Sequence, residues 1–185
     1  MRIVKLMALI GLVGSAQVAA ADTPVGEVET LSVSPVVTQT VVLEASAEAV
    51  WNAFTTEAGY EGWAAPFARI DLAVGGQIEA SYADNPQAGS PDNIVIEIQA
   101  YLPQELLVLK TVQAPPGTMD QDTLDRLVSI FEFQAIDAQT TRLTVHGVGY
   151  EESDEALKQF FLQGNAWSMQ QLSAYLATVE DEPAP

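Results

Sequence analysis

Cysteine is absent from this 185-residue chain, and histidine occurs once, as His146. Without thiols the protein can form neither disulfides nor thiolate metal sites, and it has no cysteine nucleophile. A single histidine also excludes a histidine-rich metal cluster. Basic residues are scarce as well, with 7 Lys and Arg against 25 Asp and Glu and a formal net charge of −18. Such a charge repels nucleic acids and anionic lipid headgroups, so we expect no nucleic-acid partner.

Catalytic and cofactor motifs are also missing. The sequence contains no G-x-S-x-G, no H-E-x-x-H, no P-loop and no dinucleotide-binding fingerprint. Three neighbouring acids, Asp120, Asp122 and Asp125, lack the glycine and the terminal glutamate of a calcium loop. We therefore expect no cofactor and no metal, and a binding or interaction domain is favoured over an enzyme.

The apolar run at the start of the chain is short. Residues 6–14 follow the basic residues Arg2 and Lys5, and an A-x-A pattern ends at Ala21. This layout is typical of a cleaved secretory signal peptide over residues 1–21. The run is about half of the ~20 residues that span a bilayer, so we expect no stable membrane insertion after cleavage. The expected location is the bacterial periplasm or the medium, and loss of Arg2 and Lys5 leaves a mature charge of −20.

The remaining chain divides into one domain with an extension at each end. Residues 22–35 contain Pro24 and Pro35 and show no periodicity, which predicts a flexible N-terminal arm. Residues 181–185 predict a disordered tail. Between them, residues 36–180 show one continuous pattern that predicts a single domain.

Two periodicities divide that domain. Alternation of apolar and polar residues predicts strands, and Ser46 is a good N-cap for a short helix over residues 47–55. The period changes to 3.6 over residues 153–179, which predicts a long amphipathic helix. The predicted strands are residues 36–43, 69–74, 77–82, 94–101, 106–112, 127–136 and 141–148. An antiparallel sheet with one long helix must bury its apolar face against that helix, so the fold class is α+β.

Three stretches resemble a known family. They are V-V-L-E-A-S-A-E-A-V-W at residues 41–51, Trp63 followed by D-L-x-x-G-G at residues 71–76, and the closing helix over residues 164–176. In order and spacing they resemble the START-like SRPBCC superfamily, and within it the heat-shock-protein-90 ATPase activator homologue family. The resemblance implies a helix-grip fold of about six to seven strands curved around the C-terminal helix, with short helices after the first strand and often a cavity. It transfers no chaperone function. The family is named after an activator of a cytosolic ATPase, whereas this chain is expected to be exported.

The closing helix departs from the family pattern at one position. Asn165 replaces a tryptophan there, and Trp167 lies two residues further on, where we expect it to rotate inward and fill the space. Asn165 lies on the apolar stripe between Phe161 and Met169. A buried amide without a partner costs about 1–3 kcal/mol, so Asn165 needs a ligand, a water or a backbone carbonyl.

The candidate ligand-binding residues come from three parts of the fold that the resemblance implies. Aromatic residues after the first helix would border the cavity mouth, two phenylalanines share a strand face, and the remainder lie on the helix stripe. They are Trp63, Phe67, Tyr82, Phe131, Phe133, Phe161, Asn165 and Met169. Ordinary core packing is the alternative role for each of them.

Three functions stay open at this point. The first is an exported domain that binds a small apolar or amphipathic molecule in the cavity. The second is a non-catalytic interaction or stress-associated module with a filled core, whose cavity would be smaller than the ~300 Å³ of a small ligand site. The third is a cyclase- or dehydratase-like enzyme, which needs Glu97, Glu132 and His146 inside the cavity. Strand alternation places His146 opposite Leu143 and Val145, on the outer face.

Overall fold

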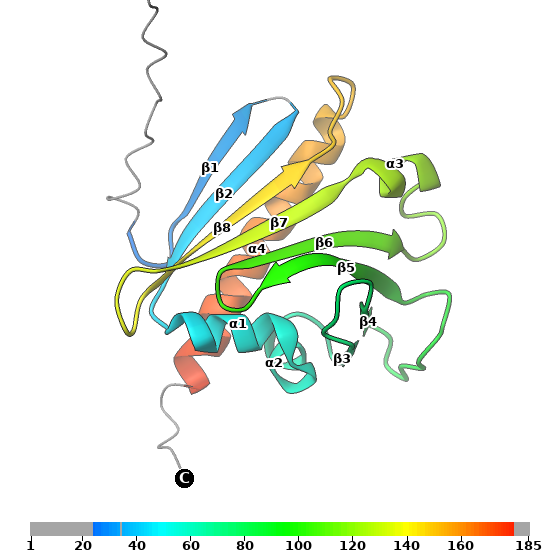
Figure 1. The fold of residues 1–185 in the computed structure, drawn as a ribbon. Helices are drawn as coiled ribbons and strands as arrows, with labels where there is room; N and C mark the ends of the chain where they lie inside the picture. Colours follow the sequence, from blue (N-terminus) through cyan, green and yellow to red (C-terminus); the bar gives the residue numbers. More distant parts are fainter. Residues whose placement is uncertain (1–23, 34, 180–185) are drawn as a thin grey trace, which may run out of the picture.

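The computed structural model describes residues 24–33 and 35–179 of the chain (Figure 1). The predicted signal peptide, residues 1–21, and the predicted tail, residues 181–185, lie outside the described residues. Within the described part, none of the helices combines the length and the apolar character needed to cross a membrane.

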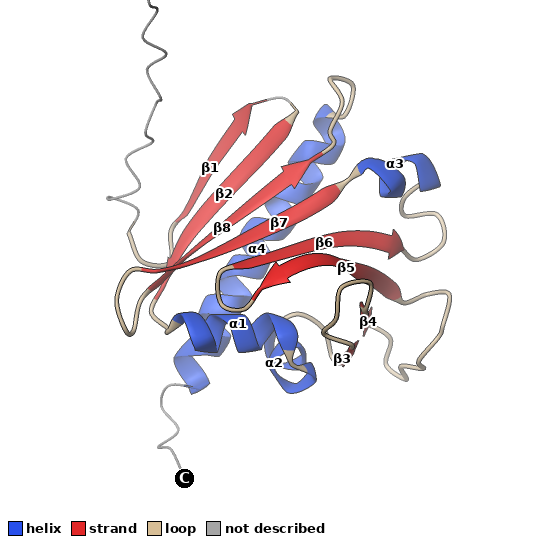
Figure 2. Ribbon diagram, viewed as in Figure 1, coloured by secondary structure: helices blue, strands red, loops and turns tan. Residues whose placement is uncertain are grey.

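The central element is an eight-stranded antiparallel sheet with the order β1-β2-β8-β7-β6-β5-β4-β3. Figure 2 shows the sheet as a curved layer with helices on one side. The strands are Val28–Val33 (β1), Val36–Leu43 (β2), Phe67–Ile70 (β3), Gln77–Ser81 (β4), Ile94–Leu102 (β5), Leu106–Gln113 (β6), Val128–Ala135 (β7) and Thr141–Val148 (β8). The predicted α+β helix-grip fold is confirmed, with one strand more than the six to seven that the sequence indicated.

The additional strand is β1, within the segment predicted as a flexible arm. It pairs with β2 along its whole length, from Val28 opposite Val41 to Val33 opposite Val36. Val28 packs against the core, although the apolar residues of the segment, Val28, Leu31 and Val33, do not all fall on one strand face, so periodicity does not predict this. The arm interpretation is therefore wrong for Val28–Val33, because β2 offers this segment a free edge with which to pair.

Two short helices follow β2. Helix α1, Ala47–Thr55, has the predicted bounds, and the Ser46 hydroxyl accepts a hydrogen bond from the Ala49 backbone N–H at 3.1 Å. Helix α2, Glu57–Trp63, begins at a similar cap, where Thr56 accepts from the Gly59 backbone N–H. Between β3 and β4, Gly75 has a φ of +82°, which explains the need for glycine in the D-L-x-x-G-G turn.

The long helix α4, Glu155–Val179, lies behind the sheet and crosses it diagonally in Figure 1. Its buried face carries Met169, Leu172 and Leu176, which pack against β2 and the first two helices. Helix α3, Gln121–Arg126, lies beside β6 at the end of the sheet away from α1 (Figure 1).

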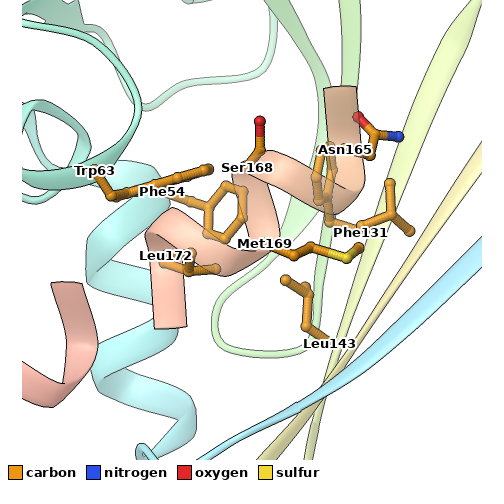
Figure 3. Close-up of a pocket in the computed structure, with 9 residues that line it drawn as sticks. Phe54, Trp63, Phe131, Leu143, Asn165, Ser168, Met169 and Leu172 are labelled. Atoms are coloured by element: carbon orange, nitrogen blue, oxygen red, sulfur yellow. The ribbon is translucent and has the colours of Figure 1, made fainter. Parts of the chain in front are cut away.

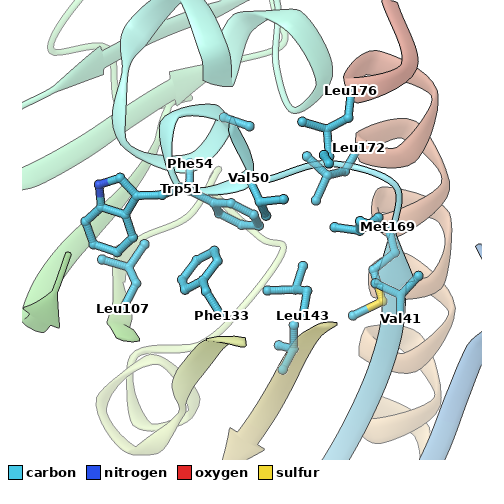
Figure 4. Packing of buried hydrophobic residues seen from close by; sticks show 14 of the residues in the cluster. Val41, Val50, Trp51, Phe54, Leu107, Phe133, Leu143, Met169, Leu172 and Leu176 are labelled. Atoms are coloured by element: carbon cyan, nitrogen blue, oxygen red, sulfur yellow. The ribbon is translucent and has the colours of Figure 1, made fainter. Parts of the chain in front are cut away.

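The main core lies between α1, α4 and the inner face of the sheet (Figure 4). Phe54 is its aromatic centre, with ring centroids 5.0 Å from Trp63, 5.2 Å from Phe131 and 5.5 Å from Phe133. Edge-to-face and tilted contacts of this kind add roughly 0.5–1.5 kcal/mol each beyond the area they bury. The core thus joins the short helices firmly to β7.

Candidate functional site

A small cavity lies between α4 and the inner face of β7 and β8 (Figure 3). Its volume is about 30 Å³, enough for one or two water molecules, since a water needs roughly 10–15 Å³ by this measure. The lining is almost entirely apolar. It consists of Phe54, Trp63, Phe131, Leu143, Val145, Asn165, Ser168, Met169 and Leu172.

Four of the predicted site residues border this cavity: Trp63, Phe131, Asn165 and Met169. The other lining residues were not predicted as site residues. They belong to strand and helix faces that the alternation marks as core, and no local signal separates a core residue from a cavity wall. Trp63 is fixed in its place because its indole N–H donates to the Ala53 carbonyl oxygen at 2.9 Å.

Two amide side chains at this level of the fold have unused hydrogen-bonding capacity. Asn165 has no side-chain hydrogen bond to any described residue. Gln39 is only 2% exposed; its amide N–H groups donate to the Leu162 carbonyl oxygen at 3.0 Å and the Thr30 hydroxyl at 3.4 Å. Its Oε1 atom finds no partner among the described residues. Gln39 is paired with Val145, a cavity-wall residue, in the β2–β8 register, but Gln39 does not line the cavity itself.

The remaining predicted residues lie elsewhere. Phe133 is buried in the main core, where it contacts Trp51 and Phe54. Phe67 is half-buried on β3, and Tyr82 is 62% exposed after β4. Neither Phe67 nor Tyr82 lines the cavity.

Trp167 does not fill the space left by Asn165, so that expectation is wrong. Its side chain is 57% exposed. Residues two positions apart in an α-helix lie about 200° apart around its axis. The side chain at position 167 therefore points away from the buried Met169.

A second cavity, also about 30 Å³, lies near the start of α4 and under α3. It is lined by Leu109, Thr111, Met119, Leu124, Leu127, Val128, Ser129, Tyr150 and Phe161. Phe161, the last of the predicted residues, belongs here, 6.1 Å from the Tyr150 ring between centroids. Burial, helped by the nearby Asp154 carboxylate, raises the pKa of Tyr150 to about 12, so this phenol stays neutral at physiological pH.

An ion pair fixes the chain around this second cavity. Arg126, at the end of α3, donates to the Asp154 carboxylate just before α4, with Nη2 3.0 Å from Oδ1. The same guanidinium donates to the Gly149 carbonyl oxygen at 2.7 Å. The hydrogen bond from Arg126 and a second from the Glu151 backbone N–H hold the pKa of Asp154 below its ordinary value of 3.8.

We expect the Asp154→Asn variant to lose stability only above the range in which Asp154 protonates. Because the pKa of Asp154 is lower in the folded state, its stabilisation is complete above the unfolded value and is lost as pH falls through the folded value. The melting temperature of Asp154→Asn should therefore fall below that of the wild type at pH 7, and the gap should be smaller at pH 2, below the ordinary pKa of 3.8. Differential scanning calorimetry at both pH values measures it. The same gap at pH 2 as at pH 7 would contradict this role, and the exposed Glu152→Gln serves as the control.

The titratable groups considered for catalysis lie on the convex face of the sheet. His146 Nε2 is 3.5 Å from a Glu132 carboxylate oxygen, and His146 Nδ1 is 2.9 Å from the Thr38 hydroxyl. Glu97 accepts from Gln99 on the same convex side of β5. The enzyme hypothesis required these groups to converge in the cavity, and the sheet itself separates them from it.

The fold and the cavity together define a class. A curved antiparallel sheet folded around a long C-terminal helix, with short helices after the first core strand, is the START-like helix-grip architecture. The sequence also matches a family model described as activator of Hsp90 ATPase homolog 1-like protein over residues 44–177. The chain belongs to this family.

Solved structures agree with the fold assignment. A protein from Nitrosomonas europaea superimposes with a TM-score of 0.60 at 13% identity, covering 80% of this chain and 97% of that one. A protein from Mycobacterium smegmatis gives 0.59 at 20% identity, with 84% and 99% covered. A protein from Mesorhizobium loti gives 0.57 at 19% identity, with 76% and 97% covered. At these identities the likeness establishes the fold alone, and no curated protein sequence matches the chain significantly.

Proposed function

We propose that this domain is an exported binding protein for a small, mainly apolar molecule that carries one hydrogen-bonding group. The observation that carries the proposal is the Asn165 amide, which together with Ser168 is polar in a mainly apolar cavity lining and has no hydrogen-bond partner among the described residues. The Asn165 side chain is only half-buried, so its amide stays open to water, and a ligand group that bonds to it would add a net hydrogen bond of about 1 kcal/mol.

The volume of the cavity sets a condition on this function. About 30 Å³ is far below the ~300 Å³ of a typical small-molecule site, so binding requires side chains to move. Met169 is the side chain best suited to move, since methionine is unbranched and adapts to irregular spaces. The ligand would take the place of the Met169 side chain, with its apolar body against Phe54 and Phe131 and its polar group at Asn165.

Phenol and benzene are suitable probes because they share an apolar body and differ by one hydroxyl. We expect phenol to bind more tightly by roughly 5-fold, as a net hydrogen bond of about 1 kcal/mol gives. The preference should vanish in Asn165→Leu and persist in Gln163→Leu, a matched change on an exposed position of the same helix. Titrations followed by protein NMR measure both affinities. A preference that survives in Asn165→Leu would contradict the polar role of this residue.

Native mass spectrometry of the protein from its own host's periplasm tests the function itself. A reproducible bound mass would support the proposal, and its fragmentation would identify the ligand class. A clean apoprotein mass, with no NMR response to either probe, would contradict it.

The second candidate function is a non-catalytic interaction module, and one observation favours it. Both cavities are about 30 Å³, which is the volume expected of a well-packed core rather than a ligand site. In this case the functional part of the molecule would be its surface, and a protein partner should co-purify in place of a small molecule.

A further inference from the structure

The exposed side of α4 differs in character from the rest of this acidic protein. Residues 159–179 contain no Asp, Glu, Lys or Arg, although the whole chain carries a formal charge of −18. A surface helix ordinarily places charged residues on its solvent face. An uncharged face of this length on such a protein indicates a surface that another molecule covers.

Two large aromatic side chains stand on that face. Phe160 is 68% exposed and Trp167 is 57% exposed. Gly164 lies between them at a spacing of four and three residues, so the three positions share one side of the helix. Around the point that a Cβ atom would occupy at Gly164, no described atom lies within 4 Å apart from the neighbouring backbone of the helix itself. The face therefore presents two projections with a gap between them.

We propose that a second copy of this chain docks here, α4 against α4 in antiparallel orientation, with the two helices crossing at Gly164. In an antiparallel pair that crosses at one residue, positions equally far before and after the crossing face each other. Phe160, four residues before the crossing, then faces Ser168 of the other copy and lies next to Trp167, three residues after the crossing, and the two glycines allow the helix axes to approach. The pattern is self-complementary, as a two-fold interface requires.

Charge favours a second copy over other occupants. A cationic partner would find no carboxylate on this face, and an anionic lipid surface is repelled by the net charge. Two copies of so acidic a protein also repel each other. This repulsion is weakest where neither of the two facing surfaces carries charge. Around a crossing at Gly164, the residues that face each other on the two copies within 159–169 carry no charge, so apolar contact there is opposed least.

The size of the face predicts a weak dimer. Two copies of α4, residues 155–179, that cross antiparallel at Gly164 overlap over residues 155–173, about 28 Å, and each helix is about 10–12 Å wide with its side chains. The overlap thus offers on the order of 300 Å² per copy, below the area of most specific interfaces. We expect reversible association that depends on concentration.

Analytical ultracentrifugation over a wide concentration range is the first test. The mass should rise from that of the 19.8 kDa monomer towards twice that value. Because central aromatic residues dominate interface energies, the double variant Phe160→Glu, Trp167→Glu should weaken association by more than about 100-fold. The matched control, Val74→Glu with Tyr82→Glu, changes two exposed apolar residues elsewhere and should dimerise like the wild type.

Cysteine cross-linking tests the geometry, and the absence of native cysteines makes it specific. Gly164→Cys should form a disulfide-linked dimer under mild oxidation, because the two copies of residue 164 meet at the crossing. Val74→Cys, which is also exposed, should form far less. Three results would overturn the proposal: a monomer at every concentration without selective cross-linking, a dimer that persists in the Phe160/Trp167 variant, or binding of the monomer to zwitterionic vesicles that this variant loses.

Discussion

Replacement of Phe54 with alanine is expected to lower the free energy of unfolding by about 3–5 kcal/mol, the usual cost of a buried Phe→Ala change. Phe54 is 3% exposed and contacts the rings of Trp63, Phe131 and Phe133. It attaches α1 to β7, and its removal deletes three aromatic contacts as well as the buried area. Chemical denaturation measured by circular dichroism gives the value directly.

The control for this change is the same substitution on the surface. Phe160→Ala removes an equally large side chain that is 68% exposed, and it should change stability by no more than about 0.5 kcal/mol. A loss below about 1 kcal/mol for Phe54→Ala would mean that the surrounding residues collapse into the space. Such collapse would also contradict the importance of the Phe54 ring to the core.

The same variant gives a second measurement at the candidate site. Phe54 borders the cavity under α4, so its truncation should enlarge the ~30 Å³ space and create room for an apolar probe. Benzene should therefore raise the melting temperature of Phe54→Ala and leave that of Phe160→Ala unchanged. This result would locate the adaptable part of the core at the cavity without assuming any natural ligand.

Much of the fold was predictable because local and tertiary signals agree. Ser46 caps a helix whose apolar residues already show helical spacing, and α1 has the bounds expected from that pattern. The alternation in residues 141–148 likewise gave β8 its bounds and placed His146 on the outer face. Where one face of an element is buried, periodicity alone determines its type and its orientation.

The parts that were missed depend on neighbours that are distant in sequence. Strand β1 does not alternate, because Val28 lies on one strand face and Leu31 and Val33 on the other, and it exists because β2 leaves an edge to which it can pair. The cavity wall combines Phe54, Leu143 and Val145 from three elements, and each of them looks like ordinary core in its own segment. Asn165 was identifiable because a polar residue interrupts an apolar stripe. The exposure of Trp167 was predictable from the same stripe, because residue 167 lies about 200° around the helix axis from Met169. The expected inward rotation took account only of the space left by Asn165.

Gly149→Ala is expected to cost about 2–5 kcal/mol, from two effects at one position. Its φ of +93° lies in the left-handed region, which costs an L-residue roughly 1–2 kcal/mol. A Cβ atom would also overlap the Arg126 carbonyl oxygen, and relief of such overpacking costs about 1–3 kcal/mol.

The overlap has a further consequence, since Arg126 also donates to the Gly149 carbonyl oxygen. Any backbone shift that accommodates the methyl group must therefore strain this hydrogen bond and the nearby ion pair with Asp154. Gly117→Ala is the control, because φ is +80° there but the space around the added Cβ is open, so only the first cost applies. Thermal and denaturant unfolding of the two variants should differ by at least about 1 kcal/mol. Equal losses would mean that α3 and the start of α4 separate easily, so that the segment over the second cavity is adaptable and the Arg126–Asp154 pair does not fix it.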